Sequence, residues 1–187
     1  MQLTKLSDSS WRLSDADVSV ANLIRHALMA DVPVQAVDQV TFHQYNGPLE
    51  SAMIAHRMGQ LPVRGLEPLQ FTLKKEAPLD APLTWATSLD ITEDDGRVVK
   101  GVQEGIASGF LLVPLLAGQK VHLTCRTSLG TGRQRSTWNS VFPVVEHNEA
   151  DLRTFDIHIE TTGAIQPEAA LHAAMTYAKD VFTALSV

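Results

Sequence analysis

The feature that most constrains the fold is a helical stripe of apolar residues close to the C-terminus. After Pro167, which suits the first turn of a helix, apolar side chains recur at intervals of three and four residues. A helix at a chain end is poorly protected unless something packs on it. We therefore expect this stripe to be buried, either by the chain's own core or by a second molecule. Its members are Leu171, Ala174, Met175, Ala178 and Phe182.

A second helical stripe lies near the N-terminus, with apolar residues at the spacing i, i+3, i+4, i+7 and i+8. Ser14 followed three residues later by Asp17 resembles a capping box, which predicts the start of a helix there. Pro33 disfavours helical geometry in the residue before it, so the helix is expected to end near Asp31. The stripe consists of Val20, Leu23, Ile24, Ala27 and Leu28.

The sequence between the two stripes is rich in segments that alternate apolar and polar residues, as β-strands do. A short helix is expected at residues 49–58, with Gly59 in the left-handed conformation that often ends a helix. Asp95-Gly96 is a good hairpin turn between strands at residues 83–91 and 98–102. The order of elements, with helices near both ends and many strands between them, predicts an α+β protein rather than a parallel α/β protein.

The composition excludes several classes of protein. The chain has 187 residues, of which 44% are hydrophobic, so it can bury a sizeable core. A formal net charge of −6 argues against sequence-specific nucleic-acid binding by this chain alone. The longest apolar run, residues 110–117, is too short to span a membrane, and the first residues lack the pattern of a secretory signal. Because no secretory signal is visible, we expect an intracellular protein. Since Cys125 is the only cysteine, an internal disulfide and an all-cysteine metal site are excluded.

Four separated segments together resemble one protein family, and they follow one another in that family's order. They are residues 22–33 (NLIRHALMADVP), 55–62 (AHRMGQLP), 116–138 (LAGQKV, then GTGRQRSTW) and 159–171 (IETTGAIQPEAAL). Each is moderately specific, whereas the ordered set is strong. The set resembles the alpha, archaeal D and eukaryotic third-largest subunits of multisubunit RNA polymerases.

This resemblance implies a non-catalytic subunit that supports polymerase assembly. A discontinuous dimerisation domain, residues 1–42 and 146–187, would carry a β-rich insert domain, residues 43–145. The first and last helices would pair with a smaller alpha-like subunit, which we favour over a homodimer, and the pair would then seat the second-largest and largest subunits. The two stripes would form the dimer interface. The resemblance carries over no cofactor or metal, because the archaeal cysteine cluster is missing here.

A smaller set of charged and aromatic residues is expected to contact the large subunits. Guanidinium groups make several directed hydrogen bonds at polar interfaces, which favours Arg25 and Arg57. Three positions depart from the family pattern: His26 replaces an arginine, Arg135 replaces a histidine, and Thr137 replaces a lysine. The full set is Arg25, His26, His56, Arg57, Arg135 and Trp138.

Two alternatives stay open on sequence grounds. Asp156, His158 and Glu160 alternate on a predicted strand and so face one side, which could serve a small metal-dependent hydrolase. The same alternation also fits an ordinary solvent-facing sheet surface. A stand-alone interaction module with the same fold is the other possibility.

Overall fold

The computed structural model describes residues 1–101, 109–147 and 151–185, and it forms two compact units. Residues Met1–Val34 and Gly130–Val187 form the first, here called the outer unit. Residues Gln35–Leu129 form the second, the inserted unit. Both units combine helices with antiparallel sheets, so the predicted α+β class is confirmed.

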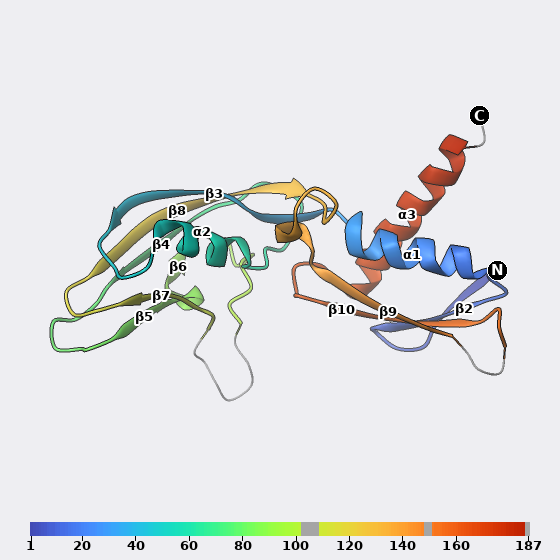
Figure 1. Ribbon diagram of the computed structural model, residues 1–187, viewed down its shortest axis with the longest axis horizontal. Helices are drawn as coiled ribbons and strands as arrows, with labels where there is room; N and C mark the ends of the chain where they lie inside the picture. The colour runs from blue at the N-terminus through green and yellow to red at the C-terminus, as the bar shows by residue number, and fades with distance from the viewer. Residues whose placement is uncertain (102–108, 148–150, 186–187) are drawn as a thin grey trace. The chain divides into compact units, whose positions relative to one another are not determined.

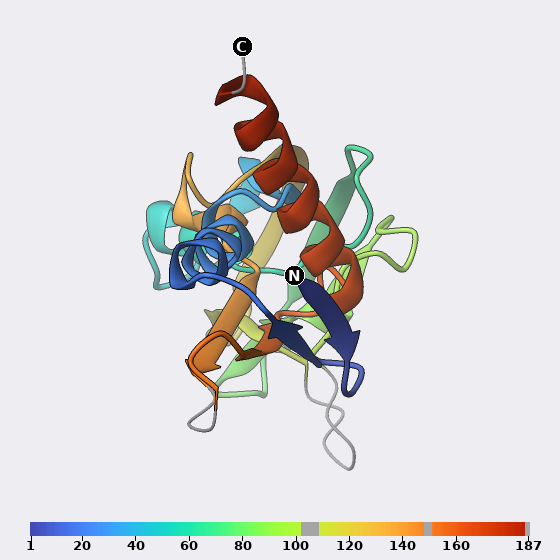
Figure 2. The same ribbon diagram turned by 90° about the vertical axis from the view of Figure 1, so that its right-hand side faces the viewer.

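The outer unit is a four-stranded antiparallel sheet with two helices on one face (Figure 1). The helices, α1 (Val18–Ala30) and α3 (Pro167–Leu185), cross each other, as a second view shows (Figure 2). In spatial order the strands are β1 (Gln2–Lys5), β2 (Ser10–Ser14), β10 (Phe155–Thr161) and β9 (Val141–His147).

The alternation of residues in these strands decides which side chains meet the helices. Ile157 lies opposite Trp11 on β2 and Val145 on β9, so these side chains share the inner face. Ile157 and Ile159 are fully buried there together with Leu28 from α1. The core of the outer unit is therefore built from the first and last parts of the sequence.

The inserted unit has a second four-stranded sheet, covered by a helix and a strand pair. Its helix is α2 (Ser51–Gly59), and the pair is β5 (Thr84–Thr87) with β7 (Leu111–Leu115). Buried side chains from the four-stranded sheet, the strand pair and the helix form one core cluster, and Phe71 is among the largest of them. The sheet order is β3 (Val34–Tyr45), β8 (Lys120–Gly130), β4 (Gln70–Glu76) and β6 (Ile91–Thr92).

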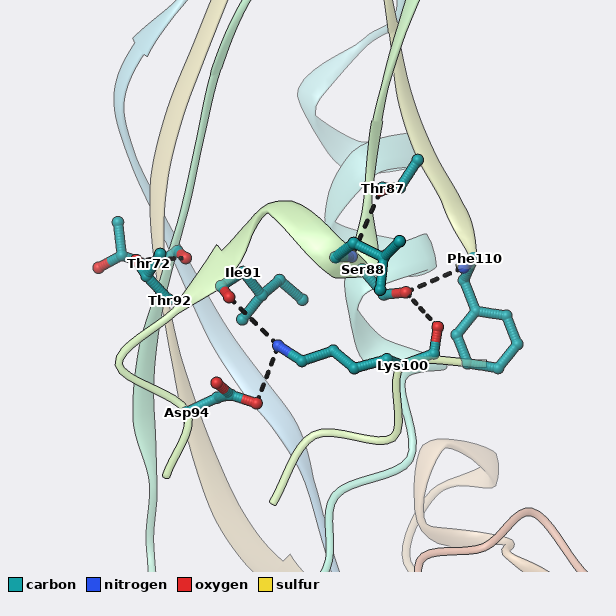
Figure 3. Close-up of polar contacts among 9 residues, drawn as sticks. Thr72, Thr87, Ser88, Ile91, Thr92, Asp94, Lys100 and Phe110 are labelled. Atoms are coloured by element: carbon teal, nitrogen blue, oxygen red, sulfur yellow. Dashed lines mark hydrogen bonds and ion pairs between the residues drawn. The ribbon is translucent and has the colours of Figure 1, made fainter. Parts of the chain in front are cut away.

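A buried serine ties two chain segments together at the start of the short helix η1 (Ser88–Asp90). The Ser88 hydroxyl donates a hydrogen bond to the carbonyl of Lys100 and accepts one from the backbone N–H of Phe110 at 2.9 Å (Figure 3). The Lys100 ammonium group lies 2.9 Å from Asp94 and 3.2 Å from the carbonyl of Ile91. These contacts hold Lys100 and Phe110 beside η1.

Two expectations about local structure are wrong. Helix α1 begins at Val18 with Asp17 as its N-cap, because Ser14 still belongs to strand β2 and Asp17 accepts the backbone N–H of Ser19 at 2.9 Å. Gly59 is the last residue of α2, and the next residue keeps right-handed helical angles, so no left-handed cap forms.

The expected hairpin at Asp95-Gly96 also does not form. Both residues have positive φ, as such a turn requires, yet Val98 bridges to Val63 instead of returning to the preceding strand. Within the predicted strand 83–91, residues 88–90 form η1 instead, and residue 102 of the next predicted strand lies outside the described residues.

The units also differ at both ends from the expected insert domain, residues 43–145. Strand β3 runs without interruption from Val34, and its residues from Gln35 onward belong to the inserted unit. Strand β9 pairs with β10, which places residues 141–145 in the sheet of the outer unit. Strand pairing therefore places the boundaries of these compact units elsewhere than the bounds that the family resemblance implies for the insert.

Candidate protein-interaction surfaces

Helix α1 uses one side of its apolar stripe for the chain's own core. Ile24, Ala27 and Leu28 are buried against the sheet and α3. Val20 and Leu23 are only partly buried: Leu23 lies further round the helix, and Val20 lies in its first turn. The stripe thus separates into a fully covered part and a part that remains accessible.

Helix α3 is divided in the same way, but along its length. Leu171, Ala174 and Ala178 are buried, and the two alanines let neighbouring side chains approach closely. Met175 is half-buried, and Phe182 in the last described turns is 54% exposed. The C-terminal end of α3 extends past the sheet of the outer unit (Figure 1), so an apolar side chain there has no cover from that sheet.

An ion pair between an exposed guanidinium and a covered carboxylate holds the end of α1 to the loop after β8. The Arg133 guanidinium donates to both oxygens of Asp31, at 2.7 and 2.8 Å, and the Asp31 side chain is almost fully buried. The backbone N–H of Arg133 also donates to the carbonyl of Ala30 at 2.8 Å. Hydrogen bonding to Asp31, supported by Tyr177 of α3, raises the pKa of Arg133 further above its usual value. This contact joins three segments that are distant in sequence.

Glycines make the close packing of this loop possible. A Cβ atom at Gly132 would lie 2.7 Å from the carbonyl oxygen of Met29, at the end of α1. A Cβ atom at Gly130 would lie 2.5 Å from the Trp138 ring in the short helix η2 (Ser136–Trp138). The Arg135 guanidinium lies over the Trp138 ring at 4.6 Å from its centroid, so these two predicted contact residues form one cationic and aromatic unit.

Arg25 and His26, also predicted to contact a partner, lie side by side on α1. The Arg25 guanidinium contacts the side-chain oxygen of Asn22 at 3.0 and 3.2 Å and the His26 Nε2 at 2.9 Å. It also lies 3.2 Å from the sulfur of Met29. All of these contacts are made to neutral groups or to an imidazole.

The other two predicted contact residues, His56 and Arg57, belong to α2 of the inserted unit. His56 is exposed, whereas Arg57 is partly buried and donates to the carbonyl of Leu112 at 3.0 Å. Its guanidinium also lies 6.0 Å from the centroid of the Trp85 ring. Arg57 therefore supports the fold of the inserted unit, and His56 is the more accessible of the pair.

The residues of the hydrolase alternative form a sheet surface. As expected, Asp156, His158 and Glu160 share one face of β10. However, both oxygens of Asp156 accept hydrogen bonds from Arg12, at 2.7 and 2.9 Å, and His158 contacts the Ser10 hydroxyl at 2.9 Å. Among the described residues, no group of three or more histidine, cysteine or acidic side chains is placed to hold a metal ion. Nothing in this geometry favours a hydrolase.

Cys125 is a core residue of β8 rather than a reactive thiol. Its side chain is buried, and that burial raises its pKa to about 12. The described helices also contain no segment that is long and apolar enough to cross a membrane.

Comparisons with known proteins place the chain among RNA polymerase subunits. A family model described as the RNA polymerase Rpb3/Rpb11 dimerisation domain matches residues 11–182. The chain is 25% identical over 173 residues to subunit Rpo3 of DNA-directed RNA polymerase from Methanocaldococcus jannaschii, covering 88% of this chain and 82% of that protein. It is 27% identical over 149 residues to RNA polymerase II subunit rpb3 from Dictyostelium discoideum, covering 68% of this chain and 49% of that protein.

A third relative has a different kind of name. The conjugation stage-specific protein of Tetrahymena thermophila is 24% identical over 211 residues, covering 94% of this chain and 67% of that protein. The Rpo3 subunit of Pyrococcus horikoshii is covered over 56% of its length. The chain thus spans only about half the length of several relatives that it matches.

Proposed function

Because the chain belongs to the RNA polymerase Rpb3/Rpb11 dimerisation domain family, we propose that it acts as a non-catalytic assembly subunit of a DNA-directed RNA polymerase. The family match covers most of the chain and confirms the resemblance inferred from four sequence segments. Relatives from archaea and eukaryotes carry the names of polymerase subunits. In this role the chain would position other subunits inside the cell, while catalysis would reside in the largest ones.

The dimerisation surface, in this proposal, lies on the outer unit. The observation that supports it is the apolar C-terminal end of α3, which extends past the sheet with Phe182 exposed. Val20, Leu23 and Met175 are the other predicted interface residues that remain partly accessible. The remaining six are already buried by the chain itself and would support the surface from beneath: Ile24, Ala27, Leu28, Leu171, Ala174 and Ala178.

A smaller alpha-like subunit is the partner that we favour for this surface. The family description names two chains, Rpb3 and Rpb11, which fits a pair of unlike subunits better than a pair of identical ones. The assembled pair would then seat the second-largest and largest subunits, and the proposed contacts are Arg25, His26, His56, Arg57, Arg135 and Trp138.

The dimerisation proposal is tested by changing Phe182 to Glu in the full chain co-expressed with its smaller partner. A charge at this position would have to be desolvated at the interface, so the variant should lose the partner in size-exclusion chromatography with light scattering. Phe142→Glu is the matched control, because Phe142 is 50% exposed but lies on β9, on the sheet face away from the helices.

Three results would contradict parts of the proposal. If the Phe182 variant keeps its partner as well as the wild type does, the surface on α3 is not the interface. A stable, symmetric species of two identical copies in the wild type would exclude the unlike pair. If an affinity-purified wild-type chain brings down no large polymerase subunits, as measured by mass spectrometry, the assembly role itself fails.

A further inference from the structure

The sheet of the inserted unit carries a row of basic side chains on the face that α2 and the β5–β7 pair leave open. Side chains alternate along a strand, and Val121 and Leu123 of β8 are buried in the core, so His122 points to the open face. Lys74 of β4 lies directly opposite His122 in the strand register. On the other side, the centroid of the His43 ring on β3 lies 4.8 Å from that of the His122 ring. The row thus crosses three adjacent strands.

A hollow of about 500 Å³ opens on this face, and Lys74 and His122 line it. Lys120 and Gln44 extend the lining, so the hollow lies where β8 begins and β3 and β4 end. Sites for small molecules have volumes of about 300–1,000 Å³. The hollow therefore has the size of a small-molecule site, and most of the side chains around it are polar.

The chain itself neutralises only part of the positive charge at this hollow. Three lysines line it, and two of them are paired: Lys120 with Glu76 at 2.8 Å and Lys75 with Asp90 at 2.5 Å. Among the described residues, no carboxylate lies within ion-pair distance of Lys74, the third lysine. Like charges directly opposite each other destabilise a sheet, so Lys74 and a protonated His122 repel. An anion bound in the hollow removes this repulsion.

We propose that this hollow binds a small ligand with a chain of phosphate groups, either free or carried by a nucleoside. Lysine ammonium groups bind phosphate oxygens as point charges. Adjacent strands are about 4.8 Å apart, so the row from His43 to Lys74 spans about 10 Å. A chain of phosphates can reach along such a row, whereas a single phosphate contacts only part of it.

The charge balance of the whole chain favours a small ligand over a long nucleic acid. The net charge of −6 repels a polyanion that extends across the surface. A small ligand responds mainly to nearby groups, because charges are screened beyond about 8 Å at physiological ionic strength. The proposed binding does not depend on the assembly function, since all of its groups belong to this chain.

The next row along the sheet limits where the ligand can lie. The hydroxyl of Thr124 lies 2.9 Å from Nε2 of His43 and holds that ring beside His122. Thr72, opposite Thr124, donates its hydroxyl to the Glu93 carboxylate at 2.9 Å. This carboxylate repels an anion, so the phosphate chain lies on the other side of the basic row, in the hollow.

Isothermal titration calorimetry of the full chain with inorganic tripolyphosphate tests the proposal. Lys74→Gln should weaken binding on the order of tenfold, because a charge-assisted contact is lost. Glu76→Gln should strengthen binding roughly threefold, since it removes a negative charge and releases Lys120. Lys179→Gln, at an exposed position of α3, is the matched control and should bind like the wild type. Changes of opposite sign from two neighbouring residues identify this hollow as the site.

Nuclear magnetic resonance locates the ligand independently of these variants. The imidazole signals of His43 and His122 should shift when tripolyphosphate is added, whereas that of His172, exposed on α3, should not. A wild type that binds no tripolyphosphate would overturn the proposal. So would equal affinities of the Lys74 and Lys179 variants, or unchanged signals of both histidines in the row.

Further titrations distinguish the sources of the phosphate chain. Equal affinities for tripolyphosphate and ATP would show that the phosphates alone are recognised, and tighter binding of ATP would identify a nucleoside as the carrier. Either result supports the site. Tighter binding of a single-stranded RNA or of a poly-glutamate peptide than of tripolyphosphate would overturn the proposal in favour of a macromolecular partner.

Discussion

The two units of this chain complete their cores in different ways. In the inserted unit, the largest fully buried side chains, such as Phe71 and Leu123, are covered by α2 and the β5–β7 pair from the same unit. In the outer unit, α1 and α3 cover the sheet with their buried stripes, but Phe182 and part of the α1 stripe remain accessible. The outer unit thus leaves part of its apolar helix surface accessible, and the proposed dimerisation would bury that surface.

The largest expected effect tests the self-sufficiency of the inserted unit. Phe71→Ala should lower the free energy of unfolding by about 3–5 kcal/mol, because it leaves a cavity in a closed core. Phe142→Ala is the matched control on the outer unit; its side chain is half exposed, so its effect should be much smaller. Urea denaturation followed by circular dichroism measures both. Equal losses in the two variants would contradict the contrast between a closed core and an exposed sheet face.

A smaller loss is expected when the polar clamp of the inserted unit is broken. Ser88→Ala removes a buried hydroxyl that both donates to Lys100 and accepts from Phe110 (Figure 3). Leaving these backbone groups unpaired should cost about 1–3 kcal/mol of stability. Hydrogen exchange should show faster exchange of the Phe110 amide. Ser51→Ala, at an exposed position of α2, is the control. An unchanged Phe110 exchange rate would show that the clamp does not hold this segment.

The next prediction tests which residue caps the start of α1: Asp17, as in the structure, or Ser14, as the sequence pattern suggests. Asp17→Ala should lower the midpoint of thermal unfolding by roughly 2–4 °C, because the backbone N–H of Ser19 loses its acceptor. Ser14→Ala should have little effect, since Ser14 lies in β2 and does not cap the helix. Differential scanning calorimetry compares the two. A larger decrease in the unfolding midpoint for Ser14→Ala than for Asp17→Ala would instead identify Ser14 as the residue that caps the helix.

These cases show which features the sequence could predict. The apolar stripes of α1 and α3 were predictable because helical spacing is a local pattern, and the buried residues Leu28 and Leu171 follow it. The same spacing does not tell whether a stripe faces the chain's own sheet or another molecule. That is why Ile24 was expected at a dimer interface and lies in the core of the outer unit.

Long-range polar contacts could not be predicted from the sequence, for a different reason. Asp31 and Arg133 are 102 residues apart, and no local pattern marks them as a pair. Both lie in segments that carry the family resemblance, yet the resemblance assigned neither of them a role. Ser88, similarly, is an unremarkable residue in a predicted strand until Lys100 and Phe110 are brought beside it. Only the folded chain reveals such contacts.

The smallest effect concerns the outer sheet face and its dependence on pH. Hydrogen bonds from Arg12, and with them its positive charge, hold the pKa of Asp156 below its usual value, although partial desolvation opposes this. Because the folded-state pKa is the lower one, the pair stabilises the fold fully above the unfolded-state pKa, about 3.9. That stabilisation is lost as the pH falls through the folded-state pKa.

In the Asp156→Asn variant, the free energy of unfolding should therefore depend less on pH below pH 4 than in the wild type. Urea denaturation at a series of pH values measures this. Its effect at neutral pH should be small, because exposed ion pairs contribute little. Glu146→Gln, at the position paired with Asp156 on β9, is the control. An identical pH dependence in the wild type and the Asp156 variant would show that Arg12 does not stabilise the ionised carboxylate, and the exposed face of the outer sheet would then contribute no measurable electrostatic stability.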